Sequence, residues 1–306
     1  MTSTVNTDKL MNSSGDQDSG LDLATNDTVK IKTANTDRVT VTNSNVIINE
    51  DSADVDFRVE SNGNANMLFV DGGNDCVGIG LASPASYNTH SDDLVVGGAD
   101  GNRGITIVGG DDDYSIINLN RASNTSTTPN GAIEYNHTDN AMYIKAGGTT
   151  SMTIDSTGRI LTPARPCFSA RKNRASGGAT GYQGDPLVFD VENFDIGGNF
   201  NTTDGKFTTP VAGVYQFSFV GFGCSSSGGP LPDATSIYVQ ISRDGTTFGS
   251  SSYGYSNGAT SYPNVSFTLI QQLNAGEEIA IHVLGAYCYA DTTHKFDPLF
   301  CGHLIG

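Results

Sequence analysis

A run of alternating aromatic residues constrains the fold of this chain more than any other feature. In Val214–Phe219, the residues Tyr215, Phe217 and Phe219 alternate with small or polar residues. Successive side chains of a β-strand point to opposite faces, so these three rings share one face. Pro210 interrupts the chain just before the run, as residues that bound a strand do. The pattern predicts an all-β fold with an aromatic core.

Further aromatic and turn residues precede this run, at Phe189, Asp195, Phe200, Phe207 and Gly213. Together with the three rings above, they resemble the signature of the complement component 1q globular head, part of the tumour necrosis factor-like jelly-roll superfamily. The chain end, Phe300–Ile305, resembles the closing strand of that family. The resemblance covers residues 164–306 and implies a jelly-roll head that forms a homotrimer and binds partners.

We expect eight strands in this head, the number typical of a jelly roll. They are Cys167–Ala170, Leu187–Asp190, Val214–Phe222, Ser236–Arg243, Thr247–Ser252, Val265–Leu273, Glu278–Leu284 and Phe300–Ile305. Six aromatic residues are expected in the core: Phe189, Phe200, Phe207, Tyr215, Phe217 and Phe219. The alternate positions of the central strand, Gln216, Ser218 and Val220, are expected to face neighbouring chains of the trimer.

Three further segments are expected before the head, which spans 163–306. Residues 1–30 are polar and show no strand pattern, so we interpret them as an attachment tail, with plain disorder as the alternative. Residues 31–90 hold short β-prone runs such as Val46–Ile48, which cannot bury a core alone and predict a β-rich shaft of identical chains. Residues 91–162 are expected to form a small β-domain or a shaft repeat.

Two segments resemble parts of phage fibre proteins. Phe69–Gly80, FVDGGNDCVGIG, resembles the FVD…VGIG segment of phage tail-fibre and virion-appendage proteins. Met152–Ile160, MTIDSTGRI, resembles a strand-turn-strand that often closes fibre repeats. The resemblance implies an appendage on the virion surface, made in the host cytoplasm. Its implied partners are other virion proteins through the N-terminus, and a glycan or protein of the host surface.

Charge and composition exclude several other classes. A net charge of −17 argues against nucleic-acid binding, which needs a basic face. The apolar runs are too short to cross a membrane, and the N-terminus lacks the apolar centre of a signal peptide. We therefore expect neither membrane insertion nor export by a cleaved leader. The five cysteines are expected to be buried thiols, with a Cys288–Cys301 disulfide as the open alternative.

Residue patterns typical of catalysis are missing from the sequence. The five histidines form no zinc-binding array, and the sequence has no serine-nucleophile motif and no phosphate-binding loop. His282 alternates with Ile281 and Val283, which favours a strand residue that faces a neighbour over a catalytic base. Glu277 and Glu278 would point to opposite faces, the wrong geometry for a glycosidase pair. We expect no enzyme, no metal and no cofactor.

These patterns favour a phage tail fibre whose trimeric head binds the host cell surface. A capsid fibre or knob is the first alternative, and a polysaccharide depolymerase is the second. Since the shaft fixes one end of the jelly roll, the loops 223–235, 253–263 and 285–298 are expected at the tip. Their expected receptor-binding residues are Tyr253, Tyr255, Tyr262, Tyr287, Tyr289 and His294. For each tyrosine, the alternative is a place in the core or in the trimer seam.

Overall fold

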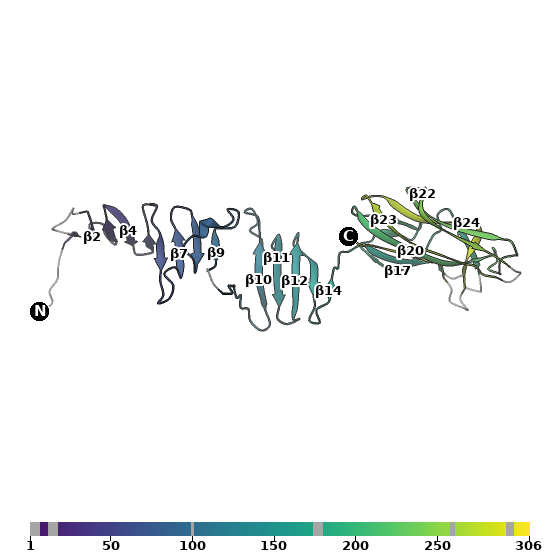
Figure 1. The fold of residues 1–306 in the computed structure, drawn as a ribbon, viewed down its shortest axis with the longest axis horizontal. Helices are drawn as coiled ribbons and strands as arrows, with labels where there is room; N and C mark the ends of the chain where they lie inside the picture. The colour runs from purple at the N-terminus through teal and green to yellow at the C-terminus, as the bar shows by residue number, and fades with distance from the viewer. Residues whose placement is uncertain (1–6, 12–17, 99–100, 174–179, 258–260, 292–296) are drawn as a thin grey trace. The chain divides into compact units, whose positions relative to one another are not determined.

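The computed structural model describes residues 7–11, 18–98, 101–173, 180–257, 261–291 and 297–306 (Figure 1). The chain divides into two compact units, residues 1–107 and 108–306. Apart from one 3-10 turn, η1 (Pro84–Ser86), the regular elements of the described residues are β-strands. The predicted all-β class is confirmed. Among the described residues, no helix has the length and apolarity needed to cross a membrane.

The first unit begins with a five-stranded antiparallel meander. Its strands are β1 (Lys9–Met11), β2 (Gly20–Asp22), β3 (Val29–Thr33), β4 (Thr36–Val41) and β5 (Val46–Ile48). The expectation that residues 1–30 lack strands is wrong for β1 and β2, where Leu10 pairs with Leu21. Three residues are too few to show an alternation in the sequence, so such strands escape a search for periodicity.

A four-stranded sheet completes the first unit. It contains β6 (Phe57–Val59), β7 (Leu68–Asp71), β8 (Cys76–Ile79) and β9 (Leu94–Val96). β9 pairs in parallel with β8, while the other pairs are antiparallel. Residues 94–96 therefore belong to the sheet that starts at Phe57, although the sequence grouped them with the following segment. The segment boundaries expected from the sequence stay predictions.

The second unit starts with a single-layered antiparallel meander (Figure 1). It contains β10 (Tyr114–Leu119), β11 (Gly131–Asn136), β12 (Ala141–Ala146), β13 (Thr149–Ile154) and β14 (Ile160–Leu161). The turn between β12 and β13 uses Gly147 and Gly148 at φ values of 60° and 78°, which favour glycine. The β-prone run Ile105–Val108 forms no strand.

The rest of the second unit is a two-layered β-domain. Its strands are β15 (Cys167–Arg171), β16 (Thr180–Gly184), β17 (Val191–Ile196), β18 (Phe200–Asn201), β19 (Lys206–Thr208), β20 (Gly213–Cys224), β21 (Ser236–Arg243), β22 (Thr246–Tyr255), β23 (Asn264–Leu273), β24 (Glu278–Ala290) and β25 (Leu299–Leu304). Layer A has the order β17-β15-β25-β20-β23. Layer B is built on β24, which pairs with β16, β19 and β21, while β22 pairs with β21.

One of the eight strands expected in this domain is wrong. Leu187–Asp190 is not a strand, because Leu187 and Phe189 enter the core from an extended loop whose Leu187 N–H donates to the Ile281 carbonyl. The four strands β16–β19 were not expected. They are short or lack alternation, and β17, sequence VENFDI, lies at the edge of layer A with its side chains mostly exposed.

The core between the two layers is aromatic. Phe189, Phe200, Phe207, Tyr215, Phe217 and Phe219, the six residues expected there, are all buried. The Phe168 ring joins them, stacked against Phe207 with 4.7 Å between ring centroids. The Tyr215 hydroxyl donates to the Val211 carbonyl at 2.8 Å, so this buried polar group is satisfied.

Candidate functional site

The outward face of layer A carries the residues expected at a trimer interface. In β20 the aromatic side chains are buried, while Gln216 and Ser218 are half-buried and Val220 is exposed. The same layer exposes Phe194 on β17 and Ile270 on β23. Exposed apolar side chains on a sheet favour contact with another protein surface. The interface itself stays a prediction.

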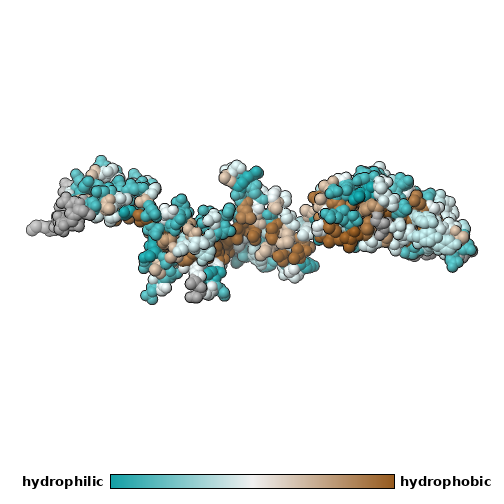
Figure 2. Space-filling view, turned by 45° about the horizontal axis from the view of Figure 1, so that its top comes forward, coloured by the Kyte–Doolittle hydropathy of each residue, from teal (hydrophilic) through white to brown (hydrophobic). Residues whose placement is uncertain are grey.

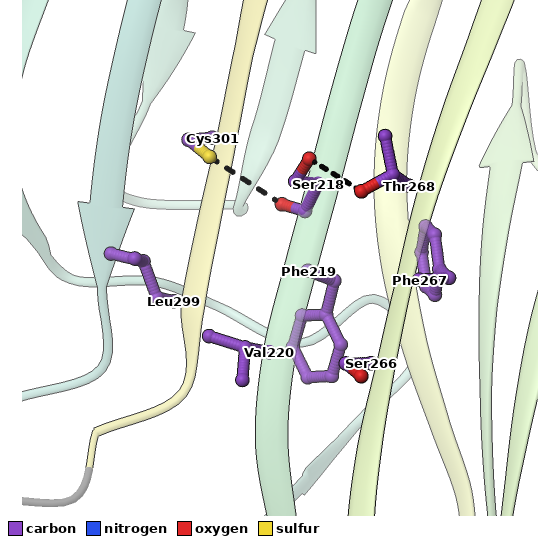
Figure 3. A pocket seen from close by; sticks show the side chains of 8 residues that line it. All are labelled: Ser218, Phe219, Val220, Ser266, Phe267, Thr268, Leu299 and Cys301. Atoms are coloured by element: carbon purple, nitrogen blue, oxygen red, sulfur yellow. Dashed lines mark hydrogen bonds between the residues drawn. The ribbon is translucent and has the colours of Figure 1, made fainter.

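A shallow groove of about 420 Å³ crosses this face between β25, β20 and β23 (Figure 3). Ser218 Oγ and Thr268 Oγ1 lie 3.0 Å apart across it, and the Cys301 thiol donates to the Ser218 carbonyl at 3.7 Å. Burial raises the pKa of the Cys301 thiol, which keeps it in the unreactive protonated form. The groove is lined by small polar and apolar side chains and offers no reactive group. It therefore suits the packing of another protein surface against layer A.

The tyrosines expected in tip loops lie largely on strands. β22 continues to Tyr255, so Tyr253 and Tyr255 are strand residues, and β24 continues to Ala290, past Tyr287 and Tyr289. The loop boundaries 253–263 and 285–298 are wrong for this reason. Gly285 has a φ of 84°, a conformation that lets β24 bend and continue where the sequence suggests a strand end. Tyr262 follows Ser261, which bridges to Leu231, and His294 lies outside the described residues.

Three exposed tyrosines on β21 and β22 form a surface that we call the tyrosine platform: Tyr238, Tyr253 and Tyr255. Their ring centroids lie 5.0 Å apart for Tyr238 and Tyr253, and 6.4 Å apart for the stacked pair Tyr253 and Tyr255. The three residues are 44% to 55% exposed. The Ser236 hydroxyl lies 3.1 Å from the Tyr253 hydroxyl. The platform thus offers aromatic ring surface and hydroxyl groups to solvent.

Tyr238 was missed by the sequence analysis, although its strand carries the signal. In β21 the residues Ile237, Val239 and Ile241 are buried, so Tyr238 must lie on the opposite face. Tyr238 is the direct partner of Tyr253 in the β21–β22 ladder. Pairing register, which the sequence does not give, is what places these two rings together.

The other expected tyrosines belong to a different environment. The rings of Tyr262 and Tyr289 lie 4.9 Å apart, and the buried Tyr289 hydroxyl donates to Asp291 Oδ2 at 2.9 Å. Burial, followed by this hydrogen bond, raises the pKa of Tyr289 to about 12. Tyr289 is therefore a structural residue, whereas Tyr262 stays exposed and Tyr287 is half-buried.

A polar pocket of about 200 Å³ lies on the same outward face of layer B. His282 Nδ1 contacts Asp185 Oδ1, and Nε2 lies 2.6 Å from Ser242 Oγ. With the ring proton on Nδ1, the imidazole donates to the carboxylate and accepts from the serine hydroxyl. Lys206 Nζ and Glu278 Oε2 lie 2.6 Å apart in the same pocket, and this hydrogen bond raises the pKa of Lys206.

These residue types occur in serine hydrolases, but the geometry favours hydrogen bonding over nucleophilic attack. Ser242 is only 2% exposed and lies within the β21–β24 ladder, opposite Ala280. An ester carbonyl has no open path to a hydroxyl held beneath an imidazole in this way. Asp185 is the accessible group of the cluster, since its side chain is 77% exposed. His282 does face its neighbours, as its alternation predicts.

The buried thiols give a prediction that tests the core of this domain. Burial raises the pKa of Cys224 to about 12, and burial together with the nearby Cys224 raises the pKa of Cys288. A raised pKa leaves almost no thiolate below pH 9, and both side chains are inaccessible. We expect no alkylation of these two cysteines by iodoacetamide in the native protein at pH 7–9, and complete alkylation in guanidinium, measured by peptide mass spectrometry. Native labelling of Cys288 would contradict the packing.

The C-terminal domain is a two-layered β-domain that resembles the C1q/TNF-like jelly roll. Residues 167–305 match the family model described as the C1q domain. The chain is similar to the globular domain of the zebrafish complement 1qA protein, with 20% identity over 46% of this chain and 98% of that chain, and a TM-score of 0.35. It is also similar to the Eiger TNF of S. frugiperda, with 14% identity over 46% and 94% of the two chains, and a TM-score of 0.34. No curated protein matches the sequence.

Proposed function

We propose that this chain is a structural fibre of a phage virion whose trimeric C-terminal domain binds the host cell surface. The observation that carries the proposal is a C1q/TNF-like domain with two distinct outward faces. Layer A exposes apolar side chains suited to chain association, and layer B exposes the tyrosine platform. Binding is adhesion without covalent chemistry, and three weak sites per fibre give avidity through high effective concentration.

The β10–β14 sheet supports association of identical chains. Ile117, Ile133, Ile144 and Met152 are direct neighbours across β10–β13, which places them on one face. Figure 2 shows hydrophobic atoms gathered over this sheet, and Ile117 and Ile133 are both exposed. The other face carries more polar side chains, including an ion pair of 2.8 Å between Glu134 and Lys145, although the exposed Ile116 also lies there, opposite Glu134. A single-layered sheet with one apolar face needs a cover, and copies of itself supply one.

The proposed role is tested by competition for the cell surface. Purified full-length protein, added in excess, should reduce adsorption of the virus to its host by occupying the receptors. A variant with alanine at all three tyrosines of the platform should compete much less while keeping the same melting curve. Full competition by this variant would move the receptor site off layer B, and no competition by the unaltered protein would contradict the proposed function.

Attachment through the N-terminus gives a second prediction. The described residues before β3 form the short strands β1 and β2, and β3–β5 can stay paired without them. We expect deletion of residues 1–28 to leave a soluble protein of unchanged oligomeric state that is absent from assembled particles, as measured by immunoblotting of purified virions. Incorporation of the truncated protein at the normal level would place the docking contact elsewhere.

Electron microscopy of labelled particles distinguishes a tail fibre from the alternative, a capsid fibre or knob. Incubation with host envelope glycans tests the depolymerase alternative. We expect the protein to release no new reducing ends, and their appearance would support a depolymerase.

A further inference from the structure

We propose that the outward face of layer B binds a neutral oligosaccharide, which lies along β21 from the tyrosine platform to the polar pocket. The inference rests on the proposed function and deepens it, because it names the chemical class of the receptor and the surface that takes it. It also moves the contact from the loops to a strand face.

The platform supplies one half of such a site. A pyranose ring presents C–H groups on its faces and hydroxyl groups at its edges, so it stacks on an aromatic ring while its edges seek hydrogen bonds. Tyrosine suits this geometry because it joins a flat apolar ring to a polar tip. The rings of Tyr238, Tyr253 and Tyr255 are close enough, at 5.0 Å and 6.4 Å between centroids, to act as one continuous surface.

The polar pocket continues the platform along the same strand. Outward-facing positions of β21 are Ser236, Tyr238, Gln240 and Ser242, and consecutive ones lie about 6.6 Å apart along a strand. His282 lies directly opposite Gln240, just as Leu284 lies opposite Tyr238. The distance from Tyr238 to Ser242 is thus about 13 Å, long enough for a chain of sugar rings.

The pocket provides the hydrogen-bonding groups that sugar hydroxyls need. The Asp185 carboxylate gives one oxygen to His282 and, being largely exposed, keeps its other oxygen for a hydroxyl donor. Beside the pocket, Gln240 accepts from the Thr247 hydroxyl at 3.2 Å through Oε1, and its amide group also carries two N–H donors. A volume of about 200 Å³ is below the roughly 300–1,000 Å³ of drug-sized sites, so the pocket fits the end of a ligand.

Charge favours a neutral ligand over an acidic one. The side chains around the rings, at Ser236, Gln240, Thr247 and Leu284, are uncharged, and the pocket contains Asp185 and Glu278 against the single cation Lys206. In a chain of net charge −17, this surface repels anionic polymers. A protein partner is less favoured, because binding hot spots need a surround that excludes water, and here, apart from Leu284, the surround is hydroxyl and amide groups.

The test is isothermal titration calorimetry of the full-length protein with a panel of neutral oligosaccharides, namely cello-, malto-, manno-, galacto- and N-acetylglucosamine oligomers, beside polygalacturonic acid as the acidic probe. We expect binding to at least one neutral series and none to the acidic polymer. Tyr238→Ala and Asp185→Ala should each weaken it about tenfold, while Tyr238→Phe, which keeps the ring, should change it less than twofold. Tyr87→Ala, an exposed tyrosine of the first unit, is the matched control.

The outcomes separate this inference from the proposed function. Binding that is unaffected by Tyr238→Ala and Asp185→Ala, or failure to bind every neutral series, overturns the saccharide site. If the protein still competes for adsorption, and protease treatment of the cells removes that competition, the receptor is a protein and the proposed function stands alone. Saccharide binding that tracks the variants, without competition for adsorption, supports the site and contradicts the role in host attachment.

Discussion

Replacing Phe217 with alanine is expected to lower the free energy of unfolding of the C-terminal domain by about 3–5 kcal/mol, the usual range for a buried phenylalanine. Phe217 is fully buried, and its ring centroid lies 5.9–6.1 Å from those of Phe207, Tyr215 and Phe300. Its direct partner on β25 is Gly302, where an added Cβ would come within 2.5 Å of the Phe217 ring. Because Gly302 has no side chain, it cannot fill the space that the Phe217 ring occupies. Alanine at this position would therefore leave a cavity.

Guanidinium unfolding at one fixed protein concentration measures this loss, since association would otherwise add to the apparent stability. Tyr253→Ala is the matched control, because it removes an aromatic ring of similar size from the exposed face of the same domain. The control should shift the free energy of unfolding by well under 1 kcal/mol. Equal effects of the two substitutions would mean that the alternation of β20 does not place Phe217 in the core.

The alternation of β20 illustrates what the sequence alone determines. Where a strand has one buried and one exposed face, a period of two shows which residues point inward, and Tyr215, Phe217 and Phe219 obey it. Leu187 and Phe189 follow the same alternation, yet they reach the core from a loop. A period of two therefore predicts which side chains are buried. It predicts strand pairing only where the backbone also forms hydrogen bonds to a neighbouring strand.

The candidate site was harder to predict, because it depends on which strands are neighbours. Tyr253 and Tyr255 were expected as binding residues because they were placed in a tip loop, whereas they lie on β22, and Tyr238 joins them through the β21–β22 register. Asp185 and His282 are 97 positions apart in the chain and meet because the loop after β16 runs beside β24. Contacts of this kind come from topology, which short sequence patterns do not specify.

The largest effect on assembly is expected from a pair of lysine substitutions, Ile133→Lys on the apolar face of the β10–β14 sheet and Val220→Lys on layer A. The unaltered chain should give a mass of about 96 kDa by light scattering, three times its 32.1 kDa. Each lysine would place an ammonium group in a face that the proposed trimer buries, at a cost of several kcal/mol per ion. Since every 1.4 kcal/mol is tenfold in affinity, the double variant should be monomeric at micromolar concentration.

Asn118→Lys is the control, because Asn118 is exposed on the opposite face of the same sheet, where it pairs with Ala132. Lysine also reduces the net negative charge of the chain, so a general increase in repulsion between chains is not the cause of any dissociation. Either single variant should keep one of the two faces intact and dissociate only on dilution. A double variant that stays trimeric would show that the chains associate through other surfaces, and a monomeric unaltered chain would contradict the fibre itself.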